Sequence, residues 1–425
     1  MAAQHKWQRQ TPEILGLLDI GTAKTVCFIV ATARQRRAGR VDVLGVGQQP
    51  SRGLKAGVVI ELDSAEQCVR AAVSEAERAA GCELRHVLLA VACGRLKSST
   101  FTAEAKTEGR AVSDADLARL LSAGRSYVER DGRALLHMNA LGYRLDATQE
   151  IADPRGLAAK VISVDLHAVT ADDAPLRNLV HVAERAYLSV TGLVPAPFAS
   201  ALAVTTTQER KAGVVVLDFG AGTTGLAAFV DGHLVASEVI PVGGHHISFD
   251  LARAFATSLQ EAERIKALCG TVPAGVGDGE TPVPLALAGE EEPKPAEPKP
   301  AQVTIGKVRE VVAARVKGLH GQIAERLERA GISPAASERV VVTGGASQLP
   351  GLSAFLAEAF SKPVRAGHPQ ATYGWPAGAA SPAYSTVLGL AQVAFDPAAG
   401  VRRSERQFQG GGYLRSVGRW LQASF

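Results

Sequence analysis

Two short stretches of this chain, about 200 residues apart, follow one pattern. Residues 17–25 read LLDIGTAKT, and residues 217–228 read LDFGAGTTGLAA. In each, an apolar run ends in aspartate, a glycine-centred turn with threonine follows, and a second apolar run begins. One copy alone could be an ordinary hairpin with glycine at its tip. Two copies favour a strand, a phosphate-binding turn and a second strand in each of two related domains, which would hold one nucleotide between them.

Both turns supply the residues that we expect at the phosphates. Glycine lets the backbone N–H groups approach phosphate oxygens, and threonine adds a hydroxyl donor. The expected residues are Gly21, Thr22, Ala23 and Lys24 in the first turn and Gly220, Gly222, Thr223 and Thr224 in the second. Asp19 and Asp218 would repel phosphate directly, so we expect them to hold Mg²⁺, if necessary through its waters.

The composition is that of a globular protein with more than one domain. The chain has 425 residues, of which 46% are hydrophobic and 21% are charged. A net charge of +4 and the lack of an aromatic-rich basic segment give no reason to expect nucleic acid as a partner. Five cysteines without a CxxC pair indicate buried free thiols in a reducing cytosol. No signal peptide or membrane-spanning run is evident, so we expect any membrane contact to be peripheral.

Four further segments divide the chain. Residues 86–93 (HVLLAVAC) predict a buried strand, and from there to about residue 166 short strands and one helix alternate with polar turns, which predicts a compact inserted subdomain with expected bounds 86–166. Residues 243–268 begin with two glycines and predict a loop that leads into one long helix. Residues 273–300 hold seven prolines and predict a flexible loop, which is either a linker or a partner-binding segment. Residues 340–351 (VVVTGGASQLPG) place a third glycine-rich turn after a strand.

Three such turns in this order resemble the superfamily of actin, heat-shock chaperones and sugar kinases. The resemblance makes the third turn an adenosine loop, whose glycines would let the backbone face the purine and ribose. Its expected nucleoside contacts are Gly344, Gly345, Ala346 and Ser347.

Residues 243–266 (GGHHISFDLARAFATSLQEAERIK) are more specific and resemble the FtsA family of bacterial cell-division actins. The resemblance implies that Gly243, Gly244, Glu263 and Lys266 lie at the nucleoside. Glu263 and Lys266 are three residues apart and therefore share one helix face. Without the flanking turns, an exposed ion pair of little energetic value would be the simpler interpretation.

The resemblance implies an α/β fold with two actin-like domains, each built on a ribonuclease H-like core. An FtsA-type insert and a C-terminal amphipathic helix complete it. The expected boundaries are 11–85 with 167–200 for subdomain 1A, 86–166 for the insert, 201–249 with 336–396 for subdomain 2A, 250–335 for subdomain 2B with a flexible loop at 272–302, 397–412 for a flexible tether and 413–425 for the helix.

The last 13 residues, YLRSVGRWLQASF, predict an amphipathic helix. At about 20 Å it is too short to span a bilayer but suited to lie in the membrane interface. A terminal helix docked on the protein's own core is the alternative, which the three glycines at residues 410–412 disfavour. The expected membrane-binding residues are Tyr413, Leu414, Arg415, Val417, Arg419, Trp420, Leu421 and Phe425.

The resemblance also implies cofactors, partners and a location. The cofactors are ATP and Mg²⁺. The partners are the C-terminal peptide of the tubulin-like protein FtsZ, further copies of the chain in a filament, other division proteins and anionic lipid of the inner membrane. The location is the cytoplasmic face of that membrane at the septum, where the protein would tether the FtsZ ring. A pilus-assembly relative of the superfamily and a small-molecule kinase are the alternatives.

Three positions depart from the family pattern in ways that concern hydrolysis. Gly225 stands where the family usually has an acidic residue, and Ala196 stands where related ATPases have glutamate. Ala23 replaces a common hydroxyl residue. Hydrolysis needs an oriented water and a base or positioning group. We therefore expect ATP to bind and to turn over slowly or not at all, and whether the protein is an enzyme stays open.

Overall fold

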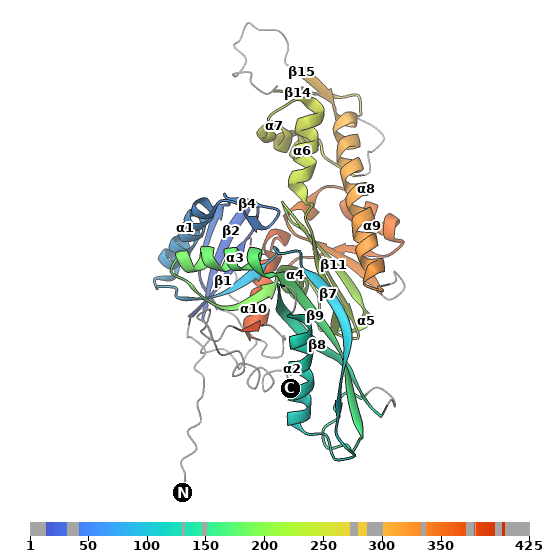
Figure 1. The fold of residues 1–425 in the computed structure, drawn as a ribbon. Helices are drawn as coiled ribbons and strands as arrows, with labels where there is room; N and C mark the ends of the chain where they lie inside the picture. The colour runs from blue at the N-terminus through green and yellow to red at the C-terminus, as the bar shows by residue number, and fades with distance from the viewer. Residues whose placement is uncertain are drawn as a thin grey trace.

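The computed structural model shows two large β-sheets, a smaller third sheet and helices packed against each of them (Figure 1). It describes residues 14–31, 42–129, 132–146, 151–272, 279–286, 301–332, 337–370, 378, 380–395 and 402–403. Within these ranges, every helix is too short or too polar to cross a membrane. The expected membrane-binding segment, residues 413–425, lies outside the described residues.

The first sheet has the strand order β18–β10–β6–β1–β2–β3. Its strands are β1 (Ile14–Ile20), β2 (Lys24–Ala31), β3 (Asp42–Pro50), β6 (His86–Val91), β10 (Ser189–Pro195) and β18 (Arg402–Arg403). The β1–β2–β3 part is antiparallel, whereas β6 and β10 run parallel to β1. A short ribbon and two helices lie beside this sheet: β4 (Leu54–Lys55), β5 (Val58–Val59), α1 (Leu62–Ala80) and α3 (Asp173–Arg185).

The second sheet has the order β13–β12–β11–β16–β17. Its strands are β11 (Val214–Phe219), β12 (Thr224–Val230), β13 (His233–Ile240), β16 (Arg339–Thr343) and β17 (Val364–Ala366). Three strands are antiparallel neighbours and two run parallel to β11, in the same arrangement as β3–β2–β1–β6–β10. The sequence prediction of two related α/β cores is confirmed by this repeated topology.

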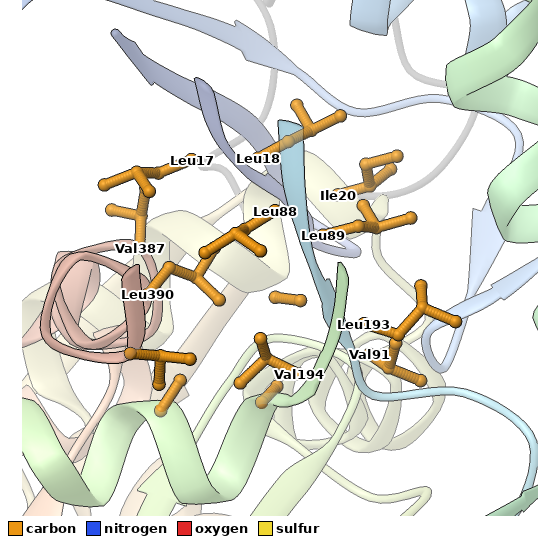
Figure 2. Packing of buried hydrophobic residues seen from close by; sticks show 14 of the residues in the cluster. Leu17, Leu18, Ile20, Leu88, Leu89, Val91, Leu193, Val194, Val387 and Leu390 are labelled. Atoms are coloured by element: carbon orange, nitrogen blue, oxygen red, sulfur yellow. The ribbon is translucent and has the colours of Figure 1, made fainter. Parts of the chain in front are cut away.

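Helices α4 (Ala196–Val204) and α10 (Ser385–Phe395) pack between the two large sheets. Leucine and valine side chains of β1, β6, β10 and α10 interdigitate there, as Figure 2 shows. Full burial of each such side chain contributes about 1.5–3 kcal/mol. The two helices approach so closely at Gly389 that a Cβ there would overlap the carbonyl of Ala199. The glycine at residue 389 therefore allows α4 and α10 to pack in direct contact between the two sheets.

A second core forms on the other face of the second sheet, because residues along β11 alternate between the two cores. The helices at this side and in the connections are α5 (Thr207–Ala212), α6 (Gly244–Phe255), α7 (Leu259–Cys269), α8 (Ile305–Arg329), α9 (Leu352–Phe360) and the 3₁₀ turns η2 (Gly345–Gln348) and η3 (Pro382–Tyr384). Figure 1 shows α6, α7 and α8 standing together above the second sheet.

The prediction of one long helix over residues 243–268 is wrong. The chain breaks at Ala256, whose φ of 50° is left-handed and ends α6. Ser258 then begins α7 by accepting a hydrogen bond from the backbone N–H of Glu261 at 3.1 Å. The break lets α7 fold back against α6.

The insert is a three-stranded antiparallel sheet, β7–β9–β8, with one helix against it and a core of its own. Its elements are β7 (Lys97–Lys106), α2 (Asp114–Val128), β8 (Arg133–Leu145) and β9 (Val161–Asp172). The predicted range 86–166 is therefore shifted. Residues 86–91 form β6, a continuous apolar strand buried between β1 and β10, and the insert's own strands are long rather than short.

Two segments expected to be flexible contain paired strands. Within the predicted loop 272–302, β14 (Pro282–Leu285) pairs with β15 (Ala301–Thr304). Within the predicted tether 397–412, β18 pairs with residues 192–193 of β10. Residues 273–278, 287–300 and 404–412 lie outside the described residues.

Candidate nucleotide site

The two phosphate-type turns have the same geometry. The N–H of Gly21 donates to the carbonyl of Lys24 at 3.0 Å, and the N–H of Gly220 donates to the carbonyl of Thr223 at 2.9 Å. Each turn joins antiparallel strands at the same register, since Asp19 lies opposite Val26 and Asp218 lies opposite Gly225. The sequence repeat is therefore a repeat of structure.

The turns face each other across the space between the two domains. A Cβ built on Gly222 would overlap the side chain of Thr22. The hydroxyl of Thr22 accepts from the backbone N–H of Gly57 at 3.1 Å, which fixes the first turn on its own domain. Only glycine at residue 222 allows the two turns to come this close.

Asp19 and Asp218 are the next-to-last residues of β1 and β11, on the two sides of this space. The pKa of Asp19 is raised to about 7, mainly by burial and secondly by the negative charge of Asp218, whereas Lys24 lowers it. Burial also raises the pKa of Asp218, against hydrogen bonds from Ser200 and Thr386 that lower it. Two enclosed carboxyl groups with raised pKa values, one of them raised in part by the charge of the other, favour a cation between them.

The second turn is attached to the start of α6. The N–H groups of Gly244 and His245 donate to the carbonyls of Gly220 at 2.9 Å and Ala221 at 2.8 Å. Any Cβ on Gly243 would come within 2.5 Å of the Gly220 carbonyl. The glycine pair that the sequence singled out is therefore needed for this close approach.

The break between α6 and α7 brings Glu263 and Lys266 back to the first turn of α6. Lys266 Nζ lies 2.6 Å from Glu263 Oε2, 2.7 Å from Ser248 Oγ and 3.3 Å from the Gly244 carbonyl. In one continuous helix, Lys266 would lie about 33 Å from Gly244. The alternative of a purely exposed pair is thus disfavoured, because Lys266 is largely buried.

The third turn packs against the second. Gly344 has a φ of 87°, and a Cβ there would overlap the Asp218 carboxyl group. A Cβ on Gly244 would lie 2.9 Å from Cβ of Ala346, which places η2 beside α6. Ser347 donates to the Gly344 carbonyl at 2.7 Å and so closes its own turn, while Gly345 is exposed.

Comparison with known proteins identifies the family. The family model described as "Cell division protein FtsA" matches residues 215–389, and that described as "SHS2 domain inserted in FTSA" matches residues 93–170. The cell division protein FtsA of Agrobacterium fabrum is 36% identical over 425 residues, covering 97% of this chain and 95% of the relative. The chain belongs to the FtsA family.

Other FtsA proteins and solved structures agree with this assignment. FtsA of Escherichia coli K12 is 29% identical, covering 96% of this chain and 97% of its own. A chain of a PilM–PilN type IV pilus biogenesis complex matches with a TM-score of 0.63 at 18% identity, covering 90% and 99%. MreB 5 of Spiroplasma citri bound to AMPPNP matches with a TM-score of 0.53 at 14% identity, covering 90% and 96%. These two structures show the actin-like fold.

Membership of the FtsA family establishes the main functional prediction, a cell-division protein, and the actin-like superfamily implies nucleotide binding. The pilus-assembly alternative has weaker support, because its resemblance is one of fold alone. The 93–170 match also agrees with the insert as the structure places it, after β6.

The candidate site also contains residues that the sequence prediction missed. The hydroxyl oxygens of Ser200 in α4 and Thr386 in α10 lie 2.9 Å apart. Both hydroxyl groups donate hydrogen bonds to the Asp218 carboxylate. The ring of Tyr384 faces the ammonium group of Lys24, whose Nζ lies over it. Tyr384 and Thr386 belong to the run PAYST at residues 382–386, which follows the third turn. The local sequence of this run does not indicate that its side chains contact distant segments.

The residues present fit a nucleotide with Mg²⁺. Glycines occupy the positions where the three turns approach most closely. A Cβ at residue 222, 243 or 344 would overlap atoms of a neighbouring turn and fill the space between the turns. The carboxylate oxygens of Asp19 and Asp218 are hard ligands of the kind that Mg²⁺ prefers. Across the described residues, no group of three or more His, Cys, Asp or Glu could hold a metal alone. Water and phosphate oxygens would therefore complete the shell, as is usual for Mg²⁺.

Proposed function

We propose that this FtsA-family protein is an ATP-binding, actin-like scaffold that polymerises on the cytoplasmic face of the inner membrane and tethers the FtsZ ring there during septum formation. The observation that carries the proposal is the pair of matching turns that meet at Thr22 and Gly222. Because each domain supplies one turn, a bound triphosphate would hold the two domains closed.

Each part of the site has a distinct role in this proposal. Backbone N–H groups of the two turns bind the phosphates, and Asp19 and Asp218 hold Mg²⁺, directly or through water. Mg²⁺ neutralises phosphate charge. Glu263 and Lys266, fixed on Ser248, lie beside the Gly243–Gly244 turn and face the nucleoside together with residues 344–347.

The proposed nucleotide acts mainly as a clamp. At Ala196 and Gly225 no acidic side chain is available to orient water, and Pro197 fills the space next to Gly225. Slow turnover would keep the domains closed and subunits stacked for long periods. A kinase function has no comparable support, because neither position offers a catalytic carboxylate toward a second substrate.

The proposed partners follow from family membership and from the C-terminal segment. They are the FtsZ C-terminal peptide, neighbouring copies of the chain, other division proteins and anionic lipid bound by residues 413–425. Attachment through one short helix is reversible, so polymerisation would strengthen membrane binding through avidity.

Two measurements test this function. Titration with a fluorescent ATP analogue in Mg²⁺ should show saturable binding that Asp218→Ala weakens at least tenfold. A pull-down with the FtsZ C-terminal peptide should retain the protein, whereas a scrambled peptide should not. Failure to bind the peptide, with nucleotide binding intact, would reject the FtsZ-tethering role.

A further inference from the structure

Residues 382–386 contact three parts of the candidate nucleotide site, namely the third turn, Asp218 and the first turn. The Pro382 carbonyl accepts from the N–H of Gly344 in the third turn at 3.2 Å. The Ser385 hydroxyl lies 2.6 Å from that of Thr343 at the end of β16. The Thr386 hydroxyl donates to Asp218 at 3.2 Å. Tyr384, between them, reaches the first turn, which belongs to the other domain.

The contact between Tyr384 and Lys24 is a cation–π interaction. Lys24 Nζ lies 3.4 Å from the centroid of the Tyr384 ring. The ring is fixed from two sides, because its hydroxyl donates to Gln48 Oε1 at 2.8 Å and Phe28 lies 6.2 Å away, centroid to centroid. A fixed ring under an ammonium group holds that group in place, which a flexible lysine side chain cannot do alone.

The Lys24 side chain lies on the same face of the first sheet as Asp19, and therefore at the candidate nucleotide site. Lys24, Val26 and Phe28 alternate along β2 and share one face. Asp19 lies directly opposite Val26, so its side chain is on that face too. Lys24 and Asp19 are close enough that each shifts the pKa of the other.

Lys24 is the single basic residue in the two phosphate turns, residues 19–25 and 218–224. The enclosed carboxylates at 19 and 218 give this space negative charge, so a triphosphate needs a compensating cation besides Mg²⁺. An ammonium group that already stands in place spares the entropy of ordering a long side chain when phosphate binds.

From this geometry we infer that Tyr384 is a positioning residue, which holds the Lys24 ammonium group beside the phosphates of the bound nucleotide. The inference rests on the proposed nucleotide binding and adds a residue to it. Tyr384 does not touch the nucleotide in this assignment but acts through Lys24. The aromatic ring is the required group, and the hydroxyl only fixes its orientation.

The test is a set of variants measured with ATP, ADP and adenosine in Mg²⁺. Tyr384→Leu removes the ring and should weaken ATP and ADP binding about two- to thirtyfold, the range of a partly desolvated cation–π contact. Adenosine, which has no phosphate, should bind as before. Tyr384→Phe keeps the ring and should restore nucleotide affinity to within about twofold of the parent, and Gln48→Ala should behave likewise.

A double variant distinguishes positioning from general damage. Lys24→Met/Tyr384→Leu should bind ATP no more weakly than Lys24→Met alone, because the ring acts only through the ammonium group. Equal loss for ATP and adenosine in Tyr384→Leu, full additivity in the double variant, or unchanged ATP affinity in Tyr384→Leu would each overturn the inference. If the parent protein bound no nucleotide at all, the proposed function itself would be wrong, and the inference with it.

Discussion

The hydroxyl group of Ser98 in the insert holds both backbone groups of Ser237 in the second sheet. The N–H of Ser237 donates to Ser98 Oγ at 2.6 Å, and Ser98 donates to the Ser237 carbonyl at 3.1 Å. Ser237 lies fully buried in β13, the edge strand of its sheet. At this one position, the side chain of Ser98 thus satisfies the backbone groups that a neighbouring strand would otherwise bind.

Ser98→Ala should destabilise the protein by about 1–3 kcal/mol, because it leaves a buried N–H and carbonyl without their partner. Urea unfolding followed by far-UV circular dichroism would measure the change. Ser99→Ala, one residue along the same strand, is the matched control and should cost less than about 0.5 kcal/mol. Equal losses in the two variants would contradict a specific role for Ser98.

Burial of His167 in the insert should make the protein sensitive to acid. The pKa of His167 is lowered to about 3, mainly by burial and secondly by nearby His137, whereas the unfolded side chain titrates near 6.5. Between pH 6.5 and pH 3 the unfolded chain binds a proton at His167 and the folded protein does not. The free energy of unfolding is therefore unaffected by this group above pH 6.5 and falls as the pH drops from 6.5 to 3. The expected loss is about 1.4 kcal/mol per pH unit in that window.

Urea midpoints at pH 7.5 and pH 5 would measure this effect. His167→Leu cannot take up a proton, so its midpoint should fall less between the two values than that of the parent. The exposed His233→Gln is a suitable control and should follow the parent. If His167→Leu lost stability as steeply as the parent, another group would be responsible.

The sequence was sufficient for the parts of the site that depend on local geometry. A tight turn between strands needs glycine at particular positions, so the turns at residues 19–25 and 218–224 could be recognised without the fold. Their repetition then predicted two domains with one topology. For the same reason, the third turn at 343–347 was identified correctly as a turn after a strand.

Contacts between distant segments could not be read in this way. Apolar periodicity continues through Ala256, so the sequence suggested one helix where the structure has two. Tyr384 lies far along the chain from the first turn, and many residues after the third. The packing of α10 on the first sheet brings it to Lys24. The buried strand at residues 86–93 was predicted, but its place in the first sheet was not, because an apolar run does not indicate which strands it pairs with.

Gly225 should resist substitution because of Pro197. A Cβ at residue 225 would lie 2.9 Å from Pro197 Cγ and 3.5 Å from Asp218 Cβ. Gly225→Ala should therefore cost about 1–3 kcal/mol through overpacking, although alanine normally suits a strand better than glycine. Pro197→Ala removes the obstructing ring, so the double variant should cost less than the sum of the single ones in urea unfolding. Additive losses would show that the two residues do not interact.

ATP turnover should be slower than about one per second, the lower end of the ordinary enzyme range. The reason is the absence of acidic side chains at Ala196 and Gly225, next to the proposed phosphates. Phosphate release at saturating ATP would give the rate, and Asp218→Ala would show how much of it belongs to this site. A steady-state rate well above one per second would reject the clamp and favour a true ATPase.

Membrane attachment should depend on the apolar face predicted for residues 413–425. Each apolar side chain contributes at most about 1.5–3 kcal/mol and each arginine about 1 kcal/mol near anionic lipid, against the cost of ordering the helix. Trp420→Glu should therefore abolish sedimentation with anionic liposomes. Gln422→Glu adds the same charge away from the centre of the apolar face and should retain most binding. Because many helices in one filament bind together, unpolymerised protein should sediment less than polymerised protein, and unchanged sedimentation of Trp420→Glu in both states would rule out this anchor.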